Sequence, residues 1–174
     1  MNVIKNLKKL ASNSRGVTAI EFALLALPFF GLIIGTIQLG VIFLANQTLD
    51  EAVDVASRGI QTGQIQTSGN INDFRTSICD RVSVISDCEN NIQLSVRSFL
   101  DFDAVETASN NGELFTSAGK PIIVNNTFSP GGGGEIVVVS ASVFIPVVVG
   151  AILSGSTNNG MQLSTSLAFK NESF

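Results

Sequence analysis

The chain has 174 residues, a formal net charge of −4 and no histidine, tyrosine or tryptophan. An acidic chain is a poor binder of nucleic acids, because affinity for phosphates comes from lysine and arginine. Without histidine it cannot build a Ser-His or Cys-His nucleophile, and it lacks the usual ligands of zinc hydrolases. The carboxylates suggest no paired acid and base, so we expect neither an enzymatic activity nor a cofactor.

An uncharged run over residues 22–45 is the main feature of the first part of the chain. At about 1.5 Å per residue it would form a helix roughly 36 Å long, which exceeds the ~30 Å hydrocarbon core of a bilayer. The run is preceded by Lys5, Lys8, Lys9 and Arg15 and followed by Asp50, Glu51 and Asp54. This asymmetry predicts one membrane crossing with a cytoplasmic N-terminus. A secretory signal peptide is the alternative, but its apolar region normally has only about 7 to 15 residues.

A short motif stands at the head of this run. A basic leader ends at Gly16, and Glu21 and Phe22 follow after four further residues. This arrangement resembles the processing site of type IV prepilins, and a Glu followed by an aromatic residue is the form favoured in the Tad (Flp) subclass. The resemblance implies that a membrane-embedded prepilin peptidase cuts between Gly16 and Val17. It also implies that the Glu21 carboxylate meets the newly formed Val17 amine of a neighbouring subunit.

Glu21 also has a simpler interpretation. A carboxylate near the positive end of a helix macrodipole gains roughly 0.3 to 1 kcal/mol, and its side chain can extend to the membrane interface. The glycine in register and the basic leader favour processing over this interpretation.

Three residues inside the run bear on helix packing. Gly31 and Gly35 form a GxxxG pattern, which lets two membrane helices approach closely. Pro28 cannot donate a hydrogen bond to the carbonyl of Leu24, so a bend or a local loosening of the helix is expected there. We predict that this part of the helix packs against another helix.

Small or apolar residues continue to recur at spacings of three and four, which predicts one helix from near Val17 to about Gln61. Its predicted packing face consists of Val41, Leu44, Thr48, Ala52, Val55, Ala56, Gly59 and Ile60. Asp54 and Arg58 lie off this face, at a spacing that supports an ion pair. Gly63 is a plausible helix stop.

The remaining chain predicts a separate head. Asn70 is a good N-cap for a short helix, whose apolar face would carry Ile71, Phe74, Ile78, Cys79 and Val82. Cys79 and Cys88 are the only cysteines, and on the oxidising side of the membrane they are expected to form a disulfide. A zinc site is the alternative, but it needs four ligands drawn largely from Cys and His.

Alternating or β-branched residues at 92–96, 135–145 and 161–169 predict three strands. The expected fold class is therefore α+β, with a long N-terminal transmembrane and amphipathic helix and a head in which an antiparallel sheet is backed by helix. The glycine run at residues 131–134 lacks the GK[ST] of a phosphate loop, so we interpret it as a flexible connection. Asp101, Asp103 and Glu106 match no calcium-loop spacing and are read as a solvated acidic turn.

The whole pattern resembles the TadE-like family of minor pilins or pseudopilins of the Tad pilus apparatus. The residues that carry the resemblance are Gly16, Glu21, Phe22, Pro28, Gly35 and the run 46–58. The closing Phe169, Lys170, Asn171 and Glu172 also resemble the family, although Ser173 stands where proline is usual. Residues 64–129 match nothing specific.

This resemblance implies four segments: a leader at 1–16, a transmembrane helix at 17–45, its amphipathic continuation at 46–63 and a periplasmic head at 64–174. The implied protein sits in the bacterial inner membrane or enters an extracellular pilus, and it acts in pilus assembly and adhesion. Its implied partners are prepilin peptidase, other Tad minor pilins, the major Flp pilin, the inner-membrane assembly platform and lipid. The alternative is a single-pass extracytoplasmic binding protein that is never processed.

Overall fold

The structure is a computed structural model that describes residues 16–65, 70–82, 87–124, 127–147 and 160–173. It divides into two compact units, Met1–Leu39 and Gly40–Phe174. The predicted leader lies outside the described residues except for Gly16. Each unit is considered by itself below.

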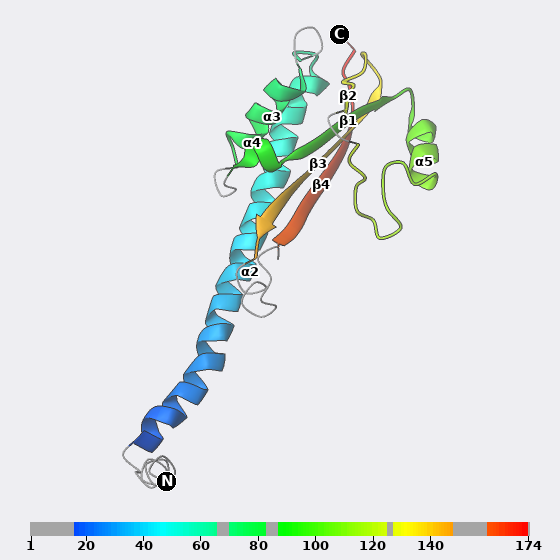
Figure 1. The fold of residues 1–174 in the computed structure, drawn as a ribbon. Helices are drawn as coiled ribbons and strands as arrows, with labels where there is room; N and C mark the ends of the chain where they lie inside the picture. The colour runs from blue at the N-terminus through cyan, green and yellow to red at the C-terminus, as the bar shows by residue number, and fades with distance from the viewer. Residues whose placement is uncertain (1–15, 66–69, 83–86, 125–126, 148–159, 174) are drawn as a thin grey trace. The chain divides into compact units, whose positions relative to one another are not determined.

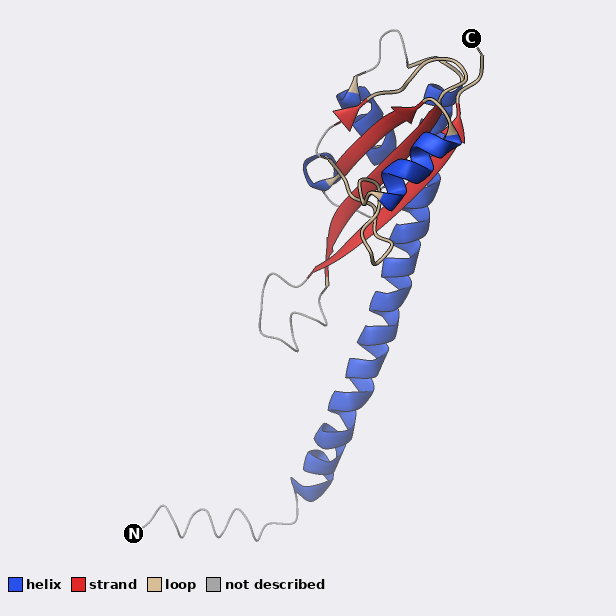
Figure 2. Cartoon of the chain, turned by 90° about the vertical axis from the view of Figure 1, so that its right-hand side faces the viewer, coloured by secondary structure: helices blue, strands red, loops and turns tan. Residues whose placement is uncertain are grey.

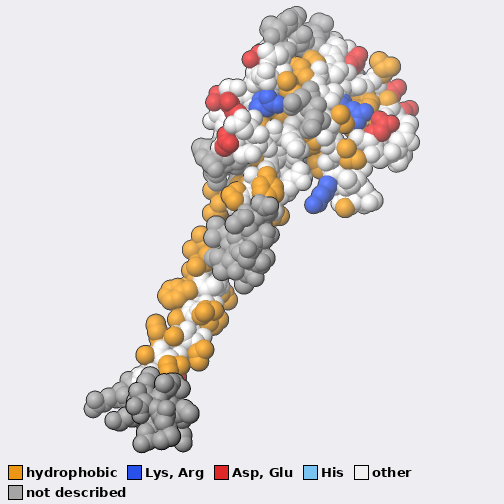
Figure 3. All heavy atoms as spheres, viewed as in Figure 1, with side chains coloured by type: hydrophobic (Ala, Val, Ile, Leu, Met, Phe, Trp, Pro, Cys, Tyr) orange, Lys and Arg blue, Asp and Glu red, His pale blue; other side chains and the backbone are white. Residues whose placement is uncertain are grey.

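Helix α2 spans Val17–Gln61, which confirms the predicted helix at both ends (Figure 1). Within the first unit large apolar side chains are exposed around the helix, and Figure 3 shows hydrophobic side chains along the face that it presents. Leu24, Leu25 and Leu27 are each at least 70% exposed. The helix is long and apolar enough to cross a membrane, where lipid would cover these exposed apolar side chains.

Four described strands form the sheet of the second unit: β1 (Gln93–Phe99), β2 (Thr127–Phe128), β3 (Ile136–Pro146) and β4 (Gly160–Lys170). Their order is β2-β1-β3-β4. β3 pairs antiparallel with β1 and β4, as predicted for the three long strands. β2 pairs parallel with β1, so the sheet is mixed rather than purely antiparallel. A two-residue strand has no alternation to detect, which is why no pattern predicted it. The α+β class itself is confirmed.

The core of the second unit lies between α2 and one face of this sheet (Figures 1 and 2). β1 and β3 contribute alternate residues to it, and α2 contributes a stripe of small and apolar residues. The strand residues are Leu94, Val96, Val137, Val139, Ala141, Val143 and, from β4, Leu163, and the buried helix residues are Ala45, Leu49, Ala52, Val53, Ala56, Ser57 and Ile60.

The predicted packing face of the helix was wrong at its N-terminal end. Ala52, Ala56 and Ile60 are buried as predicted, but Val41 and Leu44 are 45% and 49% exposed. The reason is that residues 41–45 are apolar on every side of the helix, so spacing alone cannot choose a face there. The small Ala45 is the residue that faces the core.

Two short helices, α3 (Ile71–Cys79) and α4 (Cys88–Asn91), add to the same core. Asn70 caps α3 as predicted: its side-chain oxygen accepts from the backbone N–H groups of Asn72 and Asp73, at 2.7 and 3.0 Å. The predicted disulfide between Cys79 and Cys88 is present and joins the end of α3 to the start of α4.

Helix α5 (Phe102–Asn110) packs against part of the other face of the sheet, where Ala108, Leu114 and Val138 form a small second cluster. Asp101 caps this helix, because its carboxylate accepts a hydrogen bond of 2.8 Å from the Ala104 N–H. The acidic residues around position 101 therefore have a structural explanation in the start of α5.

The glycine run is not an unconstrained connection. The Asn171 side chain donates hydrogen bonds to the carbonyls of Pro130 and Gly132, at 2.8 and 3.1 Å. The Asn171 backbone N–H donates to Glu135, and its carbonyl accepts from Gly134. Asn171 is only 2% exposed, so these bonds join the end of β4 to the loop before β3 inside the protein.

Replacing both cysteines, as Cys79→Ser with Cys88→Ser, should lower the free energy of unfolding by about 2.5 to 3 kcal/mol on the chain-entropy estimate for a loop of this size. Urea titration of the full chain in detergent would measure the change. Wild-type protein unfolded under reducing conditions is the control and should match the variant. Equal stability of the oxidised wild type and the variant would contradict the stabilising role.

Asn171→Ala removes the two hydrogen bonds that the Asn171 side chain donates to the Pro130 and Gly132 carbonyls. We expect a loss of about 2 kcal/mol, at roughly 1 kcal/mol net for each hydrogen bond. Asn110→Ala, at an exposed position at the end of α5, is the matched control and should change stability by less than about 0.5 kcal/mol. Thermal or urea unfolding would compare the two, and similar losses would contradict the role of Asn171.

Candidate functional site at the start of the apolar helix

The predicted cleavage point lies at the first of the described residues. α2 begins at Val17, the residue directly after Gly16. Gly16 is exposed, and a side chain built on it would meet no atom within 4 Å. Gly16 itself lies in a 3₁₀ turn that continues directly into α2.

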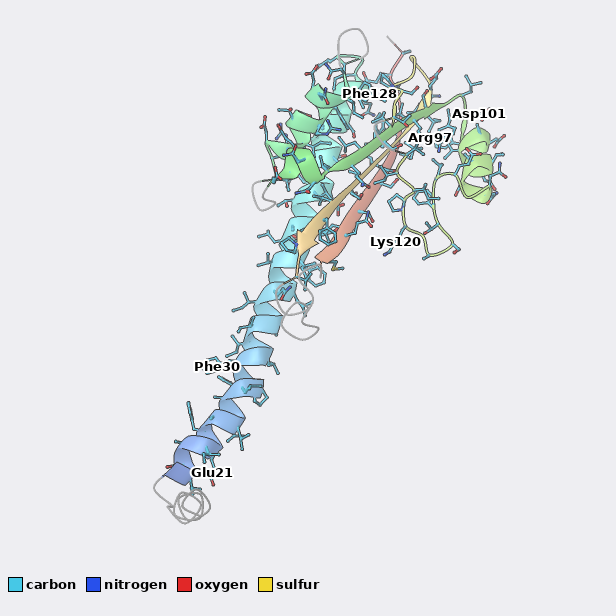
Figure 4. All side chains as sticks on the ribbon, in the orientation of Figure 1. Glu21, Phe30, Arg97, Asp101, Lys120 and Phe128 are labelled. Carbon is cyan, nitrogen blue, oxygen red and sulfur yellow. A yellow bond between two sulfur atoms is a disulfide. The ribbon has the colours of Figure 1, made fainter. Side chains whose placement is uncertain are left out.

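Glu21 lies one helical turn beyond Val17, at the start of the helix in Figure 4. Its side chain is exposed, and the ion pairs found among the described residues do not involve it. The neighbouring side chains Ile20 and Phe22 are 63% and 69% exposed and apolar. A carboxylate in such surroundings would lack a counter-charge from its own described helix, and it costs about 2.5 to 3.5 kcal/mol if carried to the centre of a membrane helix.

The predicted packing residues lie on the same side of the helix as Glu21. Pro28 follows Glu21 by seven residues and Gly35 follows Pro28 by seven, so the three positions nearly coincide in angle around the axis. Gly31 lies beside them. A side chain built on Gly31 or Gly35 would meet no atom within 4 Å. This side of the helix therefore offers open space to another helix.

Pro28 does not interrupt α2. The helix is continuous from Val17 to Gln61 with Pro28 inside it. Pro28 lacks the N–H that would bond the Leu24 carbonyl.

A second feature, a groove in the head, was not predicted. It has a volume of about 450 Å³ and lies between the end of α2 and β4, where its lining includes Ser57, Arg58, Leu167 and Phe169. Ser57 is 2% exposed, and its hydroxyl has no hydrogen-bond partner among the described residues. A serine on a mostly small and apolar helix face gives no sequence pattern that would have pointed to this groove.

Metal binding has no candidate in the described part of the chain, where no three His, Cys, Asp or Glu side chains come together. Arg97 and Glu113 form an ion pair of 3.1 Å, and Arg97 also lies over the ring of Phe99. These contacts join the loop after α5 to β1. We assign them a structural role rather than a binding role.

The fold and the start of α2 together define a class of protein: an α+β head joined to an apolar helix, the one helix among the described residues that is long and apolar enough to cross a membrane. The family model described as TadE-like protein matches residues 16–58. This match supports, over residues 16–58, the resemblance predicted from the sequence. It begins at Gly16 and ends at Arg58, so it covers the candidate site and most of α2. Searches of curated proteins and of solved structures gave no match.

Proposed function

We propose that this protein is a minor pilin or pseudopilin of the Tad (Flp) pilus apparatus, cut by prepilin peptidase between Gly16 and Val17. The observation that carries the proposal is the TadE-like family match, which starts at residue 16 and covers the Gly16, Glu21 and Phe22 motif. Gly16 is also exposed, and a side chain built on it would meet no atom within 4 Å.

Processing changes the chemistry of the helix start. Hydrolysis of the Gly16–Val17 bond creates an α-amine on Val17 one turn before Glu21. Both charges then stand at the edge of the apolar segment, where desolvation makes an unpaired charge costly. Pairing the Glu21 carboxylate with the Val17 amine of a neighbouring subunit removes this cost for both. Assembly is favoured because each added subunit satisfies one such pair.

The helix side that carries Glu21, Pro28, Gly31 and Gly35 is the surface we assign to packing against sister helices. Close approach at the glycines brings the two backbones together, and the charge pair fixes their register along the axis. The partners are other Tad minor pilins, the major Flp pilin and the inner-membrane platform. The N-terminus is cytoplasmic and the head periplasmic, or displayed on a pilus where it would contribute to adhesion. The protein has no catalytic role of its own.

The alternative is an unprocessed, single-pass binding protein whose head takes a ligand outside the membrane. The groove that holds the buried Ser57 hydroxyl is the observation in its favour. The two functions differ in the N-terminus of the native product.

Coexpression with prepilin peptidase, followed by intact-mass measurement and N-terminal sequencing, tests the proposal. We expect wild type to lose residues 1–16 and begin at Val17. Gly16→Ala should remain at full length in most molecules, because a side chain then occupies the position before the cut. Gly31→Ala is the matched control and should mature normally, since it also fills open space in this chain. A wild-type product that still begins at Met1 would refute processing and favour the alternative.

Glu21→Gln keeps the size of the side chain and removes its charge. We expect cleavage to proceed and the amount of protein in the sheared pilus fraction to fall at least about tenfold, the equivalent of ~1.4 kcal/mol of lost pairing. Glu21→Asp retains the charge and should recover part of the incorporation. Quantitative immunoblotting of membrane and pilus fractions would measure this. Normal incorporation of the Gln variant would refute the charge pair without affecting the cleavage result.

A further inference from the structure

The two edges of the described sheet differ in length and protection. One edge is β2, with two residues, and the other is β4, with 11 (Figure 1). β4 pairs with β3 without a break from Gly160 to Lys170, so no bulge interrupts it. It contains no proline and, before Lys170, no charge. Proteins normally protect a long edge strand with such devices, because its unpaired backbone groups attract another strand. The β4 edge is therefore open to strand pairing.

The register shows which backbone groups of β4 point to this edge. In an antiparallel pair, residues that stand opposite each other alternate between bonded and non-bonded pairs. The Asn171 N–H donates to the Glu135 carbonyl at 2.8 Å, and these two residues stand opposite each other when the β3–β4 register is continued by one position. The odd-numbered residues of β4 therefore bond to β3. The backbone N–H and C=O groups of Ser164, Ser166 and Ala168 point to the open edge.

The groove that holds Ser57 lies on the α2 side of the same edge. Leu167 and Phe169 line the groove, and they share a face of β4 with Leu163, which is buried in the core against α2. The other wall includes Ser57, whose buried hydroxyl has no hydrogen-bond partner among the described residues. A strand added to β4 would place every second side chain over this groove. The backbone edge and the groove thus form one surface for an extended segment.

Charge indicates which kind of strand fits. The charged residues that line the groove are Asp54 and Arg58, which pair with each other at 3.5 Å, and the exposed Glu172. The ion pairs found in the described part of the chain do not involve Glu172. A lysine or arginine on the added strand would give this carboxylate a partner. The β4 strand of a second copy does not supply one, because residues 160–169 are uncharged and antiparallel pairing carries Lys170 to the far end of the edge.

We propose that the edge of β4 from Ser164 to Lys170 binds an extended strand of a sister pilin subunit, which carries a lysine or arginine where it meets Glu172. The proposal rests on the proposed function, because it takes the partner to be another subunit of the same apparatus. It gives the head a contact of its own, which does not depend on the packing residues at the start of α2.

Residue-resolved amide hydrogen exchange of the full-length protein in detergent tests the edge directly. In the protein alone, the N–H groups of Ser164, Ser166 and Ala168 should exchange at least about 100-fold faster than those of Thr165 and Leu167, because only the latter two donate to β3. After copurification with each other Tad minor pilin and the major Flp pilin in turn, one of these partners should slow the first three at least about tenfold. Slow exchange of all three in the protein alone would contradict an open edge. Fast exchange in every mixture would overturn the proposed partner.

Ala168→Pro removes one edge-directed N–H, at a position where an edge strand tolerates proline. Ala168→Val is the matched control, because it changes the same position and keeps the N–H. We expect the proline variant to retain at least about tenfold less of the sister subunit during copurification, and the valine variant to retain the wild-type amount. Equal retention by the two variants would overturn strand pairing. Ser166→Pro removes another edge-directed N–H and replaces Ala168→Pro if circular dichroism shows that variant to be misfolded.

N-terminal sequencing of the same preparations, coexpressed with prepilin peptidase, separates this inference from the proposed function. A product that begins at Val17 but shows no protection of the β4 edge would overturn strand pairing and leave the proposed function intact. A product that begins at Met1 would overturn the proposed function, and with it the identity of the partner.

Discussion

The structure depends on a single helix that must satisfy two different surroundings. In the first unit α2 exposes apolar side chains all around its circumference. Such a surface suits the apolar interior of a membrane, where a helix satisfies its own backbone hydrogen bonds. In the second unit the same helix buries one stripe, centred on Leu49 and Val53, against β1 and β3. Among the described residues, no other helix on this face of the sheet is as long as α2. If the stripe is lost, the head loses one wall of its core.

Local patterns predicted most of the elements. The start and end of α2, the Asn70 cap and the disulfide each depend on residues close together in sequence, and all were confirmed. The three long strands followed from alternation and β-branching. Which side of the helix is buried could not be predicted at its N-terminal end. Residues 41–45 are apolar all around, and only the position of the sheet decides which of them faces the core. The short β2 and the hydrogen bonds of Asn171 are pairings between distant segments, and single-sequence periodicity does not encode such contacts.

The candidate site at the helix start was accessible to sequence reasoning for the same reason. The motif is nearly contiguous in sequence and consists of Gly16, Val17, Glu21 and Phe22. Its spacing therefore does not depend on how the head folds. The structure adds a relation that the motif alone does not state: Glu21 shares a helix side with Pro28 and Gly35. The groove around Ser57 could not be predicted from the sequence, because its walls come from α2 and from β4, which lie far apart in the sequence.

The position of β4 in the sequence has a consequence for biogenesis. Residues of α2 leave the ribosome long before β4, yet the stripe on α2 gains its full cover only when β3 has a partner and Asn171 closes the loop in front of it. The apolar helix is therefore complete while the chain behind it is still unfolded. The head reaches its full set of contacts only after synthesis has passed Asn171, because that residue closes the loop before β3.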